Sequence, residues 1–272
     1  MTQFEIKDGV AIIPEGTTEI PCRAFINCED LTTVVIPNSV TSIGEEAFFW
    51  CTSLTNIVIP NSVTSIGDCA FSGCFYLTSI VIGNSVTSIG EGAFRNCLSL
   101  TSIVILDGVK SIGRSAFDSC SSLTSIVIPD SVTSIGEEAF RCCSSLTSMV
   151  VAEGNTVYDS RENCNAIIET ATNTLICGCQ NTIIPDSVTS IGVGAFSHCS
   201  SLEEIVIPNS VTQIGDDAFS CLTSIAFEGC SSLTSITFHG TIEQWKKIIL
   251  YEDWKNDVST KVIHCTDGDV KI

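Results

Sequence analysis

The chain has 272 residues, a formal net charge of −19, and 44% hydrophobic against 16% charged residues. An acidic chain of this kind lacks the basic patches that bind nucleic acid or anionic lipid, which argues against both classes of partner. The sequence contains no apolar run long enough for a membrane-spanning helix, so membrane insertion is not expected, and MTQFEIKDGV at its start shows no signal peptide.

A phenylalanine preceded by alanine recurs with a period of 23 residues. Its positions are Phe25, Phe48, Phe71, Phe94, Phe117 and Phe140, followed after an interruption by Phe196 and Phe219. A fixed period of about 20 to 50 residues indicates a solenoid, in which each coil buries its apolar side against its neighbours. We therefore expect the phenylalanine rings of successive coils to stack on one another.

The N-terminal part of the chain, residues 1–30, holds only a partial repeat, because Asp8 and Ala11 replace the leading apolar residues. We interpret it as an N-terminal cap. Residues 31–150 follow as regular repeats, and the whole chain is expected to form one domain.

Residues 54–76 show one regular repeat, LTNIVIPNSVTSIGDCAFSGCFY. Alternating polarity from Leu54 predicts a short half-buried strand, which Pro60 ends at a corner. A second short strand is expected at residues 63–66, followed by a corner at Gly67 with positive φ. The acidic residue after the glycine favours a single helical turn leading to the phenylalanine, and we interpret the column of such residues as a solvated charge ladder rather than a calcium site.

Seven of the 16 cysteines occupy one column of the repeat, three residues after the phenylalanine. A column is better explained by burial of reduced thiols than by pairing. Coils about 5 Å apart nevertheless leave disulfides between neighbouring members of the column open.

The period stretches between Phe140 and Phe196. We interpret residues 151–184 as a variant repeat with a hairpin insertion whose turn lies around Ala171-Thr172-Asn173. Tyr158 and Arg161 break the monotony of Ser and Thr there and are a candidate specificity element.

Residues 185–238 return to the repeat, with shortened spacing at Leu222-x-x-Ile225-x-Phe227. Residues 239–272 are interpreted as a C-terminal cap. Within the cap, GTIEQWKKIILYEDWKN has a helical pattern, and Val262 to Cys265 is predicted to be the last strand.

The unit L-x-x-I-x-I-P-x-S-V-T-x-I-G-x-x-A-F-x-x-C resembles the BspA-type, or Treponema pallidum-type, leucine-rich repeat, over residues 8–238. The resemblance implies an α/β, strand-dominated solenoid: a curved right-handed stack of coils, capped at both ends, with a parallel sheet on its concave side and short second strands and helical turns elsewhere. It also implies a bacterial surface or secreted protein that adheres to host proteins and other cells. The missing signal peptide leaves a cytoplasmic location open as well.

Outward-facing residues of the first strands form two rows on the face expected to be concave, and both rows are candidate protein-binding residues. The first row is Thr33, Asn56, Ser79, Ser102, Ser125, Ser148 and Glu204. The second row is Val35, Val58, Val81, Val104, Val127, Val150 and Val206. A stripe of exposed valine can mark an interaction site, although strand propensity alone also explains valine at these positions.

The sequence gives little support for a catalytic function. The histidines beside Cys199 and Cys265 point to the opposite face from their neighbours, so neither pair makes a dyad. Cys164, Cys177 and Cys179 lack the Cys-x₂-Cys spacing of zinc sites, and we expect no metal and no cofactor.

The sequence therefore predicts a non-enzymatic, monomeric binding module for protein partners, among them host extracellular matrix or other cells. The alternative is a structural spacer or stalk within a larger secreted or surface protein. A carbohydrate-binding module would need exposed aromatic side chains in the strand rows, where the sequence has none.

Overall fold

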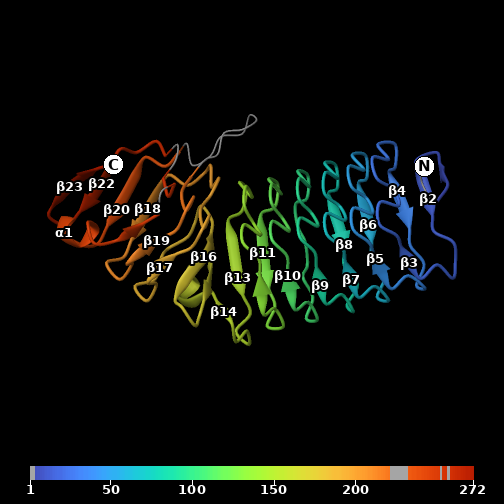
Figure 1. Ribbon diagram of the computed structural model, residues 1–272, viewed down its shortest axis with the longest axis horizontal. Coiled ribbons are helices and arrows are strands. Elements are labelled where there is room, and N and C mark those ends of the chain that lie inside the picture. The colour runs from blue at the N-terminus through green and yellow to red at the C-terminus, as the bar shows by residue number, and fades with distance from the viewer. Residues whose placement is uncertain (1–3, 221–231, 252, 256–257) are drawn as a thin grey trace. The chain divides into compact units, whose positions relative to one another are not determined.

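A computed structural model describes residues 4–220, 232–251, 253–255 and 258–272. The chain forms two compact units, residues 1–143 and 144–272, and each is built from stacked coils dominated by short strands (Figure 1). The expected strand-dominated repeat solenoid is thereby confirmed.

The second strands of the coils form a continuous parallel ladder in the first unit. The ladder consists of β3 (Glu19–Ile20), β5 (Ser42–Ile43), β7 (Ser65–Ile66), β9 (Ser88–Ile89), β10 (Ser111–Ile112) and β12 (Ser134–Ile135). Each residue pairs with the residue 23 positions further on, as Ser65 does with Ser88. The short Val-Thr-Ser-Ile strands predicted from the sequence are thus present.

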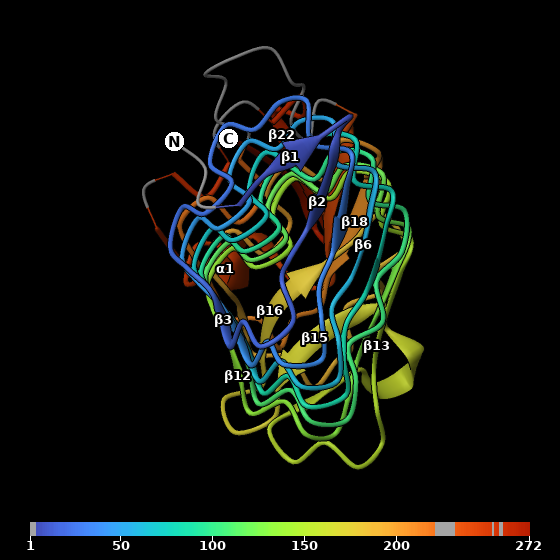
Figure 2. The same cartoon turned by 90° about the vertical axis from the view of Figure 1, so that its right-hand side faces the viewer.

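First strands lie on the other side of each coil and are less continuous. In the first unit they are β2 (Val10–Ile12), β4 (Thr33–Val35), β6 (Asn56–Val58), β8 (Ser79–Val81) and β11 (Ser125–Ile128). β2 pairs with β4, and β6 with β8, whereas residues 101–105 keep the alternating burial without a strand. In Figure 2, β3 and β12 lie on one side of the coil, and β2 and β6 lie on the other.

The N-terminal cap adds β1 (Ile6–Lys7), which pairs antiparallel with β2. Its Phe4 ring stacks on Phe25, with 5.5 Å between the ring centroids. The cap therefore covers both the sheet and the phenylalanine column at this end of the first unit.

Phenylalanine rings form the centre of the core, as predicted. From Phe25 to Phe140 the rings of successive coils are stacked, with centroid separations between 5.0 and 5.4 Å. Phe25, Phe48, Phe71, Phe94 and Phe117 have no exposed surface. Backbone bonds reinforce the stack, since the amide of Phe48 donates to the carbonyl of Ala70 in the next coil, at 2.7 Å.

The turn segment before each cysteine differs from the predicted helical turn. In residues 45–50 the amides of Glu46, Phe48 and Trp50 donate to the next coil, and the intervening amides close turns within the segment. Glu46 and Trp50 have φ of 53° and 57°, which interrupts a right-handed helix. The segment is therefore a run of turns that serves as a further ladder between coils.

The predicted positive φ at Gly67 is also wrong. None of the glycines in its column, from Gly44 to Gly215, has positive φ. Glycine is required there by close approach, because a Cβ on Gly67 would lie 2.6 Å from the carbonyl carbon of Gly44. The left-handed conformation falls two residues later, on residues such as Cys69 and Ser115.

The second unit begins with β13 (Ser148–Val151) and contains the predicted hairpin. β14 (Tyr158–Asp159), β15 (Ala166–Glu169) and β16 (Thr174–Gly178) pair antiparallel in that order. Asn173 turns the hairpin with φ of 53°. A 3₁₀ turn at Arg161–Asn163 and the strand β14 were not predicted.

Parallel strands resume after the hairpin. β17 (Ser190–Ile191), β19 (Gln213–Ile214) and β21 (Ile249–Leu250) continue from β16, while β18 (Glu204–Ile207), β20 (Ser235–Phe238) and β22 (Val262–Cys265) form a second sheet. The shortened repeat predicted around Leu222 lies outside the described residues.

The C-terminal cap is less helical than predicted. Among the described residues of the cap, only α1 (Ile242–Trp245) is helical, and it begins at a capping box formed by Thr241 and Gln244. Ile249 and Leu250 instead extend the second-strand ladder as β21. β23 (Gly268–Lys271) pairs antiparallel with β22, so the strand predicted to be last is followed by one more.

Candidate binding surface

The outward rows of the first strands lie where the sequence placed them. In each regular first strand the middle residue is buried and its neighbours are exposed, as with Asn56, Ile57 and Val58. The exposed members of the predicted rows are Thr33, Val35, Asn56, Val58, Ser79, Val81, Ser102, Val104, Ser125 and Val127 in the first unit, and Val150, Glu204 and Val206 in the second. Ser148 is half-buried.

The valine row is the most exposed apolar feature of the first unit. Its members Val35, Val58, Val81, Val104 and Val127 are 50%, 61%, 59%, 66% and 55% exposed. Val58 and Val81 are paired in register by the parallel strands β6 and β8, at the strand spacing of about 5 Å, and the other members hold the same position of their coils. The row is therefore an ordered apolar stripe rather than a set of scattered side chains.

Sequence reasoning missed two members of this row. Ile12 is 68% exposed and pairs in register with Val35, so it begins the row one coil earlier. The signal was present in the alignment of Ala11 and Ile12 with Val34 and Val35. Ile183, 75% exposed, holds the matching position before Ile184 and Pro185 in the second unit. The stretched spacing of the variant repeat hid it.

Hydroxyl groups beside the valine row divide into two sets. Several threonines just before the first strands bond to the preceding coil: Thr32 Oγ1 donates to the carbonyl of Gly9 at 3.0 Å, and Thr78 Oγ1 to that of Thr55 at 3.1 Å. Ser79, Ser102 and Ser125 are exposed one position further on. This face therefore presents small apolar groups bordered by hydroxyls.

Titratable side chains are absent from the two rows in the first unit, so no ionisation contributes to this face. The ion pairs of the first unit lie on its turn segments instead. Arg95 Nε lies 3.1 Å from a carboxylate oxygen of Asp118, and Arg114 Nη2 lies 3.4 Å from one of Glu138. In the first unit these ion pairs therefore lie outside the valine row, whereas in the second unit exposed Glu204 lies on the same face as Val206.

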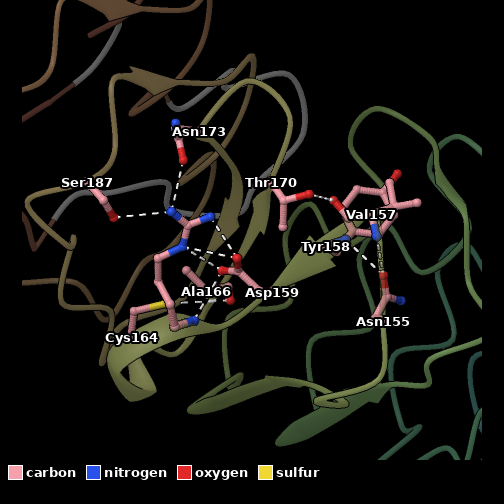
Figure 3. Close-up of polar contacts among 10 residues, drawn as sticks. Asn155, Val157, Tyr158, Asp159, Cys164, Ala166, Thr170, Asn173 and Ser187 are labelled. Carbon is pink, nitrogen blue, oxygen red and sulfur yellow. Dashed lines mark hydrogen bonds and ion pairs between the residues drawn. The ribbon is translucent and has the colours of Figure 1, made fainter.

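The candidate specificity element is internally bonded (Figure 3). Arg161 donates through Nε and Nη2 to the carboxylate of Asp159, at 2.8 and 2.7 Å, and this pairing raises the pKa of the guanidinium. Its Nη1 donates to Asn173 Oδ1 at 2.9 Å and to Ser187 Oγ at 3.3 Å. Arg161 therefore ties β14 to the hairpin turn and to the following coil.

Tyr158 is only 5% exposed, and its backbone amide donates to Asn155 Oδ1 at 2.8 Å. A buried ring cannot present itself to a partner. Of the two residues singled out in the variant repeat, only Arg161 retains an accessible side chain, 25% exposed, and its donors already have acceptors within the chain.

The cysteines of the variant repeat do not converge on one point. The thiols of Cys164 and Cys179 donate to the backbone carbonyls of Ala166 and Asn165, at 3.7 and 3.4 Å. Over the described part of the chain, no group of three His, Cys, Asp or Glu side chains is arranged to hold a metal ion. His264 has a carboxylate partner, Asp269, at 3.0 Å, and both side chains are largely exposed on a hairpin.

Fourteen cysteines lie in the described residues, and all are free thiols. In the cysteine column, each buried thiol donates to the carbonyl of the phenylalanine 26 positions earlier, as Cys97 does to Phe71 at 3.3 Å. Burial raises the pKa of these thiols, to about 12 for Cys51. The column contributes to packing and offers no reactive thiolate.

No helix among the described residues is long and apolar enough to cross a membrane. The family model described as BspA type leucine rich repeat region (6 copies) matches residues 18–147, 64–174 and 172–226. A search of curated proteins gives no match.

Solved structures of bacterial repeat proteins resemble the chain. A leucine rich cell surface protein from Faecalibacterium prausnitzii is 26% identical, with a TM-score of 0.59 over 88% of this chain and 90% of that one. The T. pallidum leucine rich repeat protein is also 26% identical, with a TM-score of 0.50 over 85% and 87%. The pneumococcal vaccine antigen PcpA, 19% identical, has a TM-score of 0.56 over 95% and 68%, which shows a shared fold.

Proposed function

The chain belongs to the BspA-type leucine-rich repeat family, and from this premise we propose that it is a non-enzymatic protein-binding module of adhesin type. The observation that carries the proposal is the valine row, five valines each at least half exposed at the same position of successive coils, with Val58 and Val81 paired in register. Apolar stripes of this kind are costly to leave in water and mark sites of protein contact. This role goes with a location at the cell surface or in the extracellular medium, and the F. prausnitzii protein is named a cell surface protein.

Uniformity of the row indicates the kind of binding. Residues of one type repeat at one spacing, so each coil offers the same small contact as its neighbours. A single contact of this size is weak, but several engaged together raise the overall affinity through avidity. We therefore propose partners with extended or repetitive surfaces, such as proteins of the host extracellular matrix or of another cell.

The test uses a double variant, Val104→Lys with Val127→Lys, which places two charges in the valine row. Binding to immobilised fibronectin, laminin and collagen is compared with that of the unaltered protein. We expect capture of at least one of these proteins, weakened at least about tenfold in the double variant because the apolar contact is lost.

A matched control is Asn38→Lys with Asn84→Lys, which adds the same charge at exposed corners outside the row. It should bind as the unaltered protein does, and thermal unfolding should show both double variants folded. The spacer or stalk role, whose support is the monotony of the surface, predicts instead that the unaltered protein captures none of the three.

A further inference from the structure

One group of aromatic side chains stands outside the core and outside the valine row. The turn segments and returning loops of two neighbouring coils carry Phe49, Trp50, Phe75 and Tyr76, which we call the aromatic platform. Trp50 is 42% exposed and Tyr76 62%, while Phe49 and Phe75 are partly exposed. The adjacent coils have Asn27 and Gly73 in the column of Trp50, and Ser53 and Ser99 in the column of Tyr76.

The platform is a defined arrangement of rings. The indole of Trp50 meets Phe75 edge-on, with 5.1 Å between centroids and an interplanar angle of 71°. The ring centroid of Phe49, the preceding residue, lies 6.3 Å from that of the indole. A Cβ on Gly73 would lie 2.8 to 3.1 Å from three atoms of the pyrrole ring, so the indole rests on a position where only glycine leaves room.

Trp50 occupies this place at a conformational cost. Its φ is 57°, a left-handed value that asparagine and glycine adopt readily and bulky residues rarely adopt. Trp245 and Trp254, in contrast, are buried in the core of the second unit. A strained and exposed tryptophan, with a glycine shaped to receive it, points to a function other than stability.

We propose that the aromatic platform binds a neutral carbohydrate chain. Pyranose rings present a face of C–H groups that packs on aromatic rings, whose faces carry partial negative charge. Thr52 and Ser53, both partly exposed, follow Trp50 in the sequence and supply hydroxyls for the rim of a sugar. Two coils span about 10 Å, which accommodates one or two sugar rings.

Other stacking partners fit less well. Nucleobases stack on aromatic rings too, but the phosphates attached to them are repelled by a chain of net charge −19. A stable protein interface needs about 800 Å² from each partner, more than four rings supply. The proposal is independent of the valine row, which lies on the first strands.

Native gel electrophoresis through gels containing mannan, arabinoxylan, mixed-linkage β-glucan or amylopectin tests the proposal. At least one polysaccharide should retard the protein, and Trp50→Asn should weaken this at least about tenfold. Because asparagine suits the left-handed conformation and occurs at this position in other coils, as Asn27 and Asn96, Trp50→Asn should unfold at no lower temperature than the unaltered protein. Tyr76→Ser should weaken binding less.

Two variants serve as controls and should bind as the unaltered protein does: Tyr251→Ser, at an exposed tyrosine in the second unit, and the double lysine variant of the valine row. Absence of retardation by all four polysaccharides, or retardation unchanged by Trp50→Asn, would overturn the proposal. If Trp50→Asn no longer captured the matrix proteins, and no polysaccharide retarded the unaltered protein, the platform would be a protein-binding site. That result would also overturn the proposal.

Discussion

At the scale of single residues, the coil is defined by where glycine is required and where it is not. The column of Gly67 has ordinary φ but no room for a side chain, because the backbone of the preceding coil passes directly beside it. Two positions later the backbone is left-handed, yet most coils carry a residue other than glycine there, including Cys69 and Ser115. Glycine is thus selected by the distance between coils rather than by backbone conformation.

This arrangement predicts opposite effects for two substitutions. Gly67→Ala should destabilise the protein by about 1–3 kcal/mol, because the new methyl group overlaps backbone atoms that cannot move independently. Ser115→Gly, at φ 51°, should be neutral or stabilising by up to about 1 kcal/mol, because it relieves left-handed strain. Urea unfolding measures both, and a comparable loss in the two variants would contradict the explanation.

The buried thiols of the cysteine column link stability to pH. Burial raises the pKa of Cys51 to about 12 and that of Cys74, Cys97, Cys120 and Cys143 well above the ordinary value of 9.0. Above about pH 9 the unfolded chain loses these protons while the folded chain keeps them. The contribution of these thiols to stability should therefore be constant below pH 8, and stability should fall steadily between pH 9 and pH 11, as measured by urea unfolding.

Cys97→Ala provides the control for this pH dependence. It should be less stable at every pH, because the carbonyl of Phe71 loses its thiol donor and a cavity is left. Above pH 9 its free energy of unfolding should nevertheless fall less steeply with pH, because one thiol fewer releases a proton on unfolding. An unchanged slope would mean that other groups cause the alkaline loss.

At the scale of elements, the phenylalanine stack supplies much of the contact between coils. Phe94 is fully buried, and its ring lies 5.4 Å from those of both Phe71 and Phe117. Phe94→Ala should cost about 3–5 kcal/mol, since stacked coils have limited freedom to fill the cavity. Ser102→Ala, on the exposed row of the following coil, should change stability by less than about 0.5 kcal/mol. Similar unfolding midpoints for the two variants would contradict this account of the core.

Periodicity predicted where the repeating elements lie, but not the conformation of the turn segment, and it gave no guidance for the irregular segments. Buried columns and both sets of strands follow from alternation of polarity, because every coil meets the same environment. The turn segment resembles a helical turn in sequence, and only the bonds to the next coil, such as that from Phe48 to Ala70, show otherwise. Strands β14 and β23 pair antiparallel within irregular segments, where the period carries no information.

For the candidate site too, the residues that follow the repeat could be predicted from the sequence, and the others could not. The exposed valines follow from counting positions in the repeat, and the same count applied to residues 10–13 would have added Ile12. The burial of Tyr158 depends on the pairing of β14 with β15, which the sequence does not indicate. The aromatic platform was missed because aromatic side chains were sought only in the strand rows, while Trp50 lies in a turn segment.

At the scale of the whole molecule, stacking gathers side chains of one kind into columns. Two acidic residues of one column, Glu45 and Asp68, belong to adjacent coils, and the amide of Glu91 in the next coil donates to Asp68 Oδ1 at 2.8 Å. Stacking that aligns valines on one side necessarily aligns carboxylates on another. The repetition that creates a binding stripe thus also creates a ladder of like charges, which disfavours self-association and repels polyanions.

This charge ladder predicts a positive effect of salt on stability. Raising NaCl from 0.01 M to 0.15 M shortens the screening length from about 30 Å to about 8 Å and weakens repulsion among the carboxylates. The thermal midpoint should then rise by about 1–4 °C. Glu45→Gln with Glu91→Gln, which removes two exposed charges from the ladder, should raise the midpoint at low salt and reduce the response to NaCl. A midpoint that falls with salt would show that attractive ion pairs, rather than the repulsion of a chain of net charge −19, dominate the electrostatics of the fold.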